Sequence, residues 1–178
     1  MASAAVMVTA SHLPFNRNGL KFFTPKGGLD SKDIAAILDI AEKGDYASTK
    51  AEGCSSTFDF MTVYSHHLAR YIRGGVGSDD YLHPLSGMHI IVDAGNGNGG
   101  FFEKVLRSLG ADTTGSQFLN PDGHFPNHIP NPENADAMAS VCKAVVESHA
   151  DLGVIFDTDV DRSAIVDHLS LIHISEPT

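Results

Sequence analysis

The apolar residues of this chain fall into two kinds of segment that alternate along its length. Short runs rich in β-branched or aromatic residues predict buried strands, and runs with apolar residues three or four positions apart predict helices. Strands that alternate with helices of this length indicate an α/β sheet. The predicted strands are 4–10, 20–24, 88–92, 113–119 and 152–156, and the predicted helices start near residues 30, 59, 101 and 132.

Capping residues give the expected limits of two of these helices. Asp30 or Ser31 is suited to cap the first helix, and Gly44 is suited to end it. Asn131 is the expected cap of the last helix, because Pro132 then stands at a first helical position, where proline is favoured.

Composition narrows the possible functions. The chain has 178 residues, of which 42% are hydrophobic, enough for one or two small domains with packed cores. Its formal charge of −10 argues against a nucleic-acid surface, although local groups of an acidic protein still bind phosphorylated substrates. Cys54 and Cys142 lack metal-ligand spacing and are typical of reduced thiols in an intracellular protein. No membrane-length apolar run or signal peptide is recognisable, so we expect a soluble protein.

Three aspartates at alternate positions follow the predicted strand 152–156. Asp157, Asp159 and Asp161 point the same way in an extended chain, and Arg162 follows at once. Open α/β sheets usually bind ligands at the carboxyl ends of their strands. Three carboxylates without Cys or His suit Mg²⁺ better than zinc. We therefore expect a metal site here, and the alternative is an acidic, solvated turn.

Two other motifs with this aspartate spacing do not fit the chain. An EF-hand loop needs Gly after the third acidic position and Glu at its twelfth position, where Arg162 and His168 stand. An aspartyl-phosphatase loop has Thr or Val at the place of Asp161.

A glycine-rich turn lies between the predicted strand 88–92 and the helix that starts at residue 101. Gly95, Gly97 and Gly100 match the dinucleotide-binding pattern in the right structural context. The acidic residue expected at the end of the next strand is missing, since Leu119 and Asn120 stand there. The alternative interpretation is a tight turn that lets the helix pack closely on the sheet.

A serine follows the first predicted strand in a turn. Ser11 lies beside His12, with Lys21 a little further along the chain. A serine nucleophile needs activation or must be carried as a phosphoester, so the spacing alone is a weak catalytic signal.

Four motifs stand in order along the chain: TASHLP at 9–14 with NGLK at 18–21, VDAGNGNG at 92–99, PDGHFPNHIPNPE at 121–133, and DTDVDR at 157–162. Together they resemble the α-D-phosphohexomutase family, which contains phosphoglucomutase, phosphomannomutase and phosphoglucosamine mutase. The sequences of residues 16–24 and 156–163 are most similar to those of the plant and algal branch, some members of which are located in plastids. Two positions depart from the family pattern, because Leu13 replaces the usual Asn and Thr158 the usual Gly.

The resemblance implies an α/β fold with mixed-sheet domains. Residues 1–58, which end with a polar linker from residue 45, are expected to form the C-terminal part of the first family domain. Residues 59–167 are expected to form most of the second domain. Residues 168–178 depart from the family, resemble translated adapter sequence, and are expected to be a non-native tail.

The resemblance also implies an enzyme, an intramolecular phosphotransferase that interconverts hexose 1-phosphate and hexose 6-phosphate. Ser11 would be the phosphorylated serine, assisted at the phosphate by His12 and Lys21. Arg162 would support the metal-loop side of the site. The three aspartates would hold Mg²⁺, which also contacts the serine phosphate, and they are Asp157, Asp159 and Asp161.

Further expectations concern activity and location. The sugar-recognition and distal phosphate-binding loops of the family have no counterpart here, so we expect this chain by itself to have negligible mutase activity. The expected partner is a hexose phosphate, without nucleic acid or membrane, in the cytoplasm or a plastid. A non-catalytic homologue that binds a metal or sugar phosphate is the main alternative function. A second, weaker alternative function is a dinucleotide-binding module that uses the glycine-rich turn.

Overall fold

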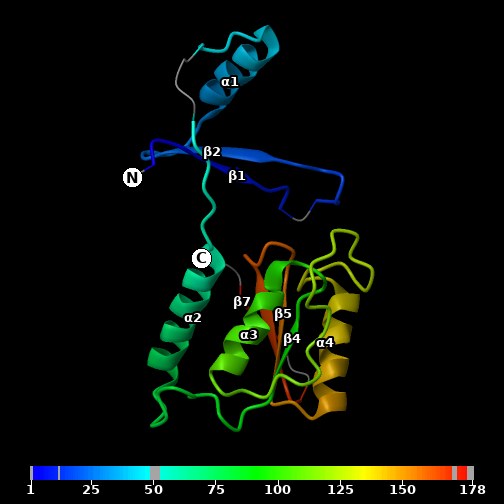
Figure 1. Cartoon of the computed structure of the whole chain (residues 1–178). Coiled ribbons are helices and arrows are strands. Elements are labelled where there is room, and N and C mark those ends of the chain that lie inside the picture. Colours follow the sequence, from blue (N-terminus) through cyan, green and yellow to red (C-terminus); the bar gives the residue numbers. More distant parts are fainter. Residues whose placement is uncertain (1, 12, 49–52, 170–171, 176–178) are drawn as a thin grey trace. The chain divides into compact units, whose positions relative to one another are not determined.

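The computed structural model of the chain describes residues 2–11, 13–48, 53–169 and 172–175, and the structural statements below concern these residues (Figure 1). The chain divides into two units, Met1–Phe58 and Asp59–Thr178. We describe each unit by itself. No helix in the described part of the chain has the length and apolar character needed to cross a membrane.

The first unit consists of a small antiparallel sheet followed by one helix. Its strands run in the order β1-β2-β3, and helix α1 comes after them. Asp30 caps α1, because its side chain accepts hydrogen bonds from the backbone N–H groups of Lys32 and Asp33. Gly44 ends the helix in the left-handed conformation, with φ of 64°. The element bounds are β1 Ala5–Val8, β2 Leu20–Thr24, β3 Gly27–Gly28 and α1 Ser31–Lys43.

Strand β1 was predicted to be buried, and this prediction is wrong for the described unit. Val6 is 54% exposed and Val8 is 70% exposed. The short apolar run did predict a strand correctly, since β1 pairs with β2 along its whole length. Burial, however, requires a second layer, and no described element of this unit covers β1 on either face.

The second unit contains a mixed sheet, which confirms the predicted α/β fold. Strand β4 (Ile90–Asp93) pairs in parallel with β5 (Leu152–Phe156), and β5 pairs antiparallel with β6 (Ser163–Asp167). Strand β7 (Ile172–Ser175), in the segment expected to be a foreign tail, pairs antiparallel with β6. The predicted strand 113–119 does not form as a strand. This segment contributes one isolated parallel bridge, between Gln117 and Asp93, and Asp112, just before it, forms another with His89.

Helices cover both faces of this sheet (Figure 1). Helix α4 (Ala135–Ser148) packs on β4, β5 and β6. Helix α3 (Phe101–Ser108) packs on β4 at the opposite face and against α2 (Phe60–Val76). Because strand side chains alternate between faces, neighbouring core residues join different clusters. On the α4 side lie Ile91, Ile155, Ala164 and Val166, and on the α3 side lie Ile90, Val92 and Phe156.

Helix α4 starts three residues later than the sequence predicts. Asn134, not Asn131, is its N-cap, because the Asn134 side chain accepts hydrogen bonds from the N–H groups of Asp136 and Ala137. The Asn131 side chain accepts from the N–H group of Glu133 and so belongs to the preceding turn. Both asparagines are suitable N-cap residues, and the turn that Asn131 forms leaves Asn134 as the cap. Sequence patterns do not reveal this turn.

The close packing of α4 on β5 gives the first testable prediction. A Cβ atom on Gly153 would lie 2.5 Å from Cγ2 of Val145 and 2.9 Å from Cγ2 of Val141. We expect Gly153→Ala to lower the free energy of unfolding by about 1–3 kcal/mol, because a helix valine must move. Urea denaturation of the chain, followed by circular dichroism, measures this change. Gly75→Ala in α2 is the control, since a Cβ there meets open space. Equal midpoints for the two variants would contradict the packing argument.

Candidate functional site

The connection between β5 and β6 gathers the three predicted metal ligands. We call Asp157–Arg162 the aspartate loop, since it fills the sequence between the end of β5 and the start of β6. One carboxylate oxygen from each of Asp157, Asp159 and Asp161 lies within 4.8 Å of the other two. Asp157 is fully buried, Asp159 is half-buried and Asp161 is exposed. Three carboxylates therefore converge at the carboxyl end of a central strand.

Reciprocal backbone contacts close this loop. The N–H group of Asp157 donates to the carbonyl of Arg162 at 3.1 Å, and the N–H group of Arg162 donates to Oδ1 of Asp157 at 3.2 Å. Between them, Val160 adopts φ of 68°, a conformation that is unusual for a β-branched residue. Its side chain packs against the core cluster that contains Phe156, which compensates for this strain.

Arg162 is the cation of the loop. Its Nε atom lies 3.2 Å from Oδ2 of Asp157 and 3.8 Å from Oδ1 of Asp161. Its Nη1 atom lies 3.5 Å from Oε2 of Glu133, in the loop before α4. One guanidinium therefore forms ion pairs with several carboxylates, so the aspartate loop keeps an excess of negative charge.

The pKa values of the loop reflect this excess. A hydrogen bond with Asp157 raises the pKa of Asp161, and burial and the charges of Asp157 and Asp159 act in the same direction. Burial alone would raise the pKa of Asp157. Hydrogen bonds from Asp161 and Arg162 outweigh that effect and lower the pKa. The loop thus holds one carboxylate ionised and disfavours the ionisation of its neighbour.

The residues present fit a hard divalent cation. Oδ1 of Asp159 is buried and has no hydrogen-bond partner among the described residues. A buried carboxylate oxygen without a partner is costly, and a bound cation would satisfy it. Oxygen ligands of this kind suit Mg²⁺ or Ca²⁺.

The glycine-rich turn lies against protein atoms on several sides. A Cβ on Gly99 would lie 2.7 Å from Cδ2 of Phe156, and one on Gly100 would overlap the carbonyl of Leu119. Gly95 has φ of 53° and faces Pro130 and His128. Close packing thus supplies a reason for these glycines without a nucleotide, as the tight-turn interpretation holds.

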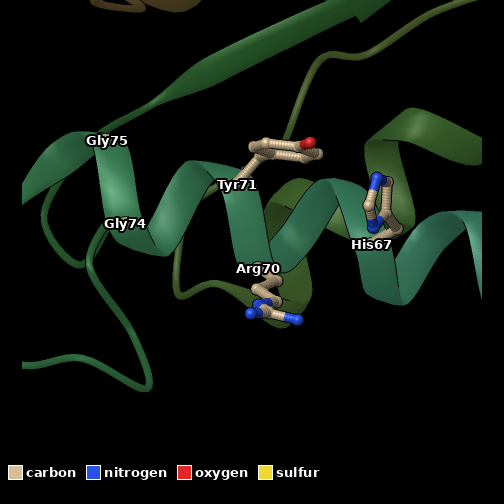
Figure 2. Close-up of a pocket in the computed structure, with 5 residues that line it drawn as sticks. All are labelled: His67, Arg70, Tyr71, Gly74 and Gly75. Atoms are coloured by element: carbon tan, nitrogen blue, oxygen red, sulfur yellow. The ribbon is translucent and has the colours of Figure 1, made fainter.

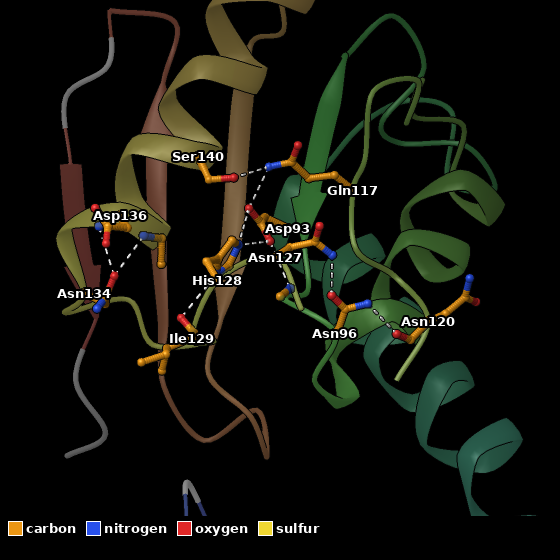
Figure 3. A network of polar contacts seen from close by, with 12 residues as sticks. Asp93, Asn96, Gln117, Asn120, Asn127, His128, Ile129, Asn134, Asp136 and Ser140 are labelled. Carbon is orange, nitrogen blue, oxygen red and sulfur yellow. Dashed lines mark hydrogen bonds and ion pairs between the residues drawn. The ribbon is translucent and has the colours of Figure 1, made fainter. Parts of the chain in front are cut away.

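A buried polar network lies at the end of β4 (Figure 3). Asp93 is fully buried, and its carboxylate contacts Nε2 of His128 at 3.0 Å. Gln117 donates to the same carboxylate at 2.7 Å and to Oγ of Ser140 at 2.8 Å. Nδ1 of His128 lies 3.1 Å from the carbonyl of Ile129. Because both ring nitrogens face acceptors, the contacts fit a protonated imidazolium.

Sequence reasoning missed this network. The position of Asp93 at the carboxyl end of a strand was a signal, but its partner His128 comes 35 residues later in a Pro-rich loop. Glu133, the partner of Arg162, was also missed, since it lies in the same loop. Only the fold brings these side chains together.

The predicted phosphoserine loop lies in the first unit. Ser11 has φ of 52°, and its N–H group donates to Oγ1 of Thr9 at 3.0 Å. The N–H group of Thr9 donates to the carbonyl of Gly19, which closes the loop at the start of β2. Lys21 lies on β2 and is exposed. His12 lies outside the described residues. The joint site of these residues with the aspartates of the second unit stays a prediction.

A surface pocket of about 440 Å³ lies along α2 (Figure 2). The described residues that line it all belong to this one helix, and the rings of His67 and Tyr71 meet edge-on at 4.6 Å. The sequence did not predict a pocket here, and the described lining contains no carboxylate. The lining residues are His67, Arg70, Tyr71, Gly74 and Gly75.

Comparison with known proteins gives matches to both units. The family model described as phosphoglucomutase/phosphomannomutase, alpha/beta/alpha domain II, matches residues 63–170, and the model for domain I matches residues 1–48. A phosphoglucomutase from Neisseria gonorrhoeae is 31% identical over 164 residues, covering 92% of this chain and 33% of its own length. A protein named phosphohexose mutases, from Xanthomonas campestris, is 36% identical over 172 residues, covering 94% of this chain and 36% of its own length.

A solved structure supports the fold. A phosphoglucomutase/phosphomannomutase family protein from Burkholderia thailandensis superimposes with a TM-score of 0.70 at 24% identity, over 95% of this chain and 34% of that protein. The chain thus spans about a third of the length of the relatives it matches. These relatives do not test the resemblance to the plant and algal branch.

The buried pair of Asp93 and His128 predicts a pH-dependent stability. The hydrogen bond to Asp93 raises the pKa of His128 above its ordinary value of 6.5, although burial opposes this, and the charge of Asp93 adds to the increase. The folded protein therefore binds this proton more tightly than the unfolded chain. The stabilisation is complete below pH 6.5 and is lost as the pH rises through the raised pKa.

Urea denaturation at a series of pH values checks this prediction. We expect His128→Asn to flatten the decrease in the free energy of unfolding above pH 6.5, because the titrating pair is gone. His66→Asn, at an exposed position on α2, is the control and should keep the original slope. A His128→Asn variant with an unchanged slope would rule out the pair as its source.

Proposed function

The chain belongs to the phosphoglucomutase/phosphomannomutase family, and from this we propose that it supplies the phosphoserine loop and the metal loop of a hexose phosphate mutase. The observation that carries the proposal is the aspartate loop, where three carboxylates converge and a buried oxygen of Asp159 lacks a hydrogen-bond partner in the described part of the chain. The reaction interconverts hexose 1-phosphate and hexose 6-phosphate.

Within this proposal, Asp157, Asp159 and Asp161 hold Mg²⁺. The bound ion neutralises charge on the phosphoryl group during its transfer. Arg162 positions the loop, because it donates hydrogen bonds to Asp157 from its side chain and its backbone. The donor set and the excess negative charge support this assignment.

Ser11 carries the phosphoryl group in the proposed cycle. The phosphoryl group of Ser11 passes to the free hydroxyl of a hexose monophosphate, which breaks the bond to Oγ and gives a hexose bisphosphate, and Oγ takes up the hydroxyl proton. After the sugar turns over, its other phosphoryl group passes to Oγ of Ser11, the serine proton goes to the released sugar oxygen, and the product is the isomeric monophosphate. Lys21 and His12 assist by countering the negative charge of the phosphate. The left-handed backbone at Ser11 supports a functional role, because strained residues concentrate at such sites.

The proposal also assigns the parts of the chain. We assign residues 1–58 to the first family domain, residues 59–167 to the second and residues 168–178 to a separate tail, while the match to the domain II model runs on to residue 170. A hexose phosphate is the substrate, and the cytoplasm or a plastid is the compartment where such substrates are available.

Removal of one aspartate tests the metal assignment. We expect Asp159→Asn to weaken Mg²⁺ binding about tenfold or more, since it removes a charge and a ligand oxygen. Calorimetric titration of the chain with Mg²⁺ measures the affinity. Asp79→Asn removes the same charge at an exposed position and is the control. Equal affinities for both variants would contradict a site in the aspartate loop.

Phosphorylation of Ser11 tests the catalytic assignment. Peptide mass spectrometry of the protein from the cells that express it naturally should find phosphate on Ser11, because the cycle returns the enzyme to its phosphorylated form. Thr9, in the same turn, is the internal control and should be unmodified. An unmodified Ser11 in a protein that binds Mg²⁺ would favour a non-catalytic, metal-binding homologue.

A further inference from the structure

We propose that Gly97 is a positioning residue for the aspartate loop, acting through the backbone of Thr158. This inference rests on the proposed function, because it assumes that the aspartate loop binds Mg²⁺. It gives the glycine-rich turn, which the sequence offers as a nucleotide site, a role in the metal site.

The contact between the turn and the loop is direct. A Cβ on Gly97 would lie 3.0 Å from both Cα and the carbonyl oxygen of Thr158. The N–H group of Asn98 donates to the same carbonyl at 3.0 Å. Thr158 joins Asp157 to Asp159, so the turn touches the backbone that sets the spacing of two ligands.

Space, and not backbone freedom, explains why glycine stands at position 97. Gly97 has φ of −82° and ψ of −159°, an extended conformation that other residues adopt easily. Gly95, with φ of 53°, differs in this respect. A side chain at position 97 would therefore be disfavoured because it displaces Thr158.

The turn is fixed on its other sides, so the loop has to yield. The N–H group of Gly95 donates to the buried Asp93, and the N–H group of Asn96 donates to the carbonyl of Phe118 at 2.8 Å. Gly99 lies against the ring of Phe156. A larger residue at position 97 would shift the aspartate loop, whose Asp161 is exposed, more easily than it would shift the turn.

Calorimetric titration of the 178-residue chain with Mg²⁺ tests the inference. We expect Gly97→Ala to weaken the affinity about tenfold, as substitutions behind metal ligands do. Gly74→Ala in α2 is the matched control, since its Cβ meets open space, and it should bind Mg²⁺ as the original chain does. Partial unfolding would lower the number of sites per chain, whereas displaced ligands lower the affinity of each site. The titration therefore separates a positioning role from a merely structural one.

The outcomes are distinguishable. If the original chain does not bind Mg²⁺, the proposed metal site fails and the inference falls with it. If the original chain binds and Gly97→Ala binds equally well, the metal site stands and only the positioning role is overturned.

A second measurement applies if Gly97→Ala does not fold. In the original chain, saturating Mg²⁺ should slow hydrogen exchange at the amide of Asn98, because the loop that accepts its hydrogen bond becomes ordered. The amide of Asn96, in the same turn but bonded to Phe118, should not change. Equal behaviour of the two amides would overturn the inference.

Discussion

The mutual hydrogen bonds between Asp157 and Arg162 are the contact on which the candidate site depends. They join the first residue of the aspartate loop to its last residue, so they fix the loop at both of its ends. The guanidinium of Arg162 then neutralises the most buried of the three carboxylates. Without this pair, burial of Asp157 would be strongly unfavourable. With it, Asp159 and Asp161 are held nearby with negative charge in excess, which is the condition for binding a cation.

Asp93 is a second buried carboxylate of this sheet, and its charge is compensated in a different way. Asp93 and Asp157 stand at the carboxyl ends of the adjacent parallel strands β4 and β5. Asp93 is enclosed by His128 and Gln117, which satisfy both of its oxygens. It is therefore a structural anchor for the glycine-rich turn and the Pro-rich loop. The carboxylates of the aspartate loop, after β5, have only some of their hydrogen-bond partners within the protein. This difference distinguishes the candidate metal site from the structural contacts of Asp93.

Whether a feature of the fold or the candidate site could be predicted depends on how far apart in the sequence the interacting residues lie. Strand β5 and the capped helix α1 follow from local sequence, and both were predicted closely. The convergence of the three aspartates was predicted, but for a different reason than the structure shows. They do not lie on an extended strand; β5 ends at Phe156, and a turn with Val160 at φ of 68° brings them together. The exposure of β1, the partner of Asp93 and the contact of Gly97 with Thr158 depend on which distant segments meet. Periodicity does not contain that information, and neither do single-residue preferences.

The two departures from the family pattern are explained by the conformations at those positions. Where the family usually has Gly, Thr158 does not have a positive φ, and the left-handed residue of the loop is Val160. The turn contacts Thr158 through backbone atoms, so a side chain there does not disturb that contact. Leu13 is 51% exposed, and its N–H group donates to the carbonyl of Ala10, a bond that any residue except proline makes. Neither side chain therefore disturbs the backbone contacts that the structure shows at these positions, and the glycine that we propose to position the aspartate loop is Gly97 on the facing turn.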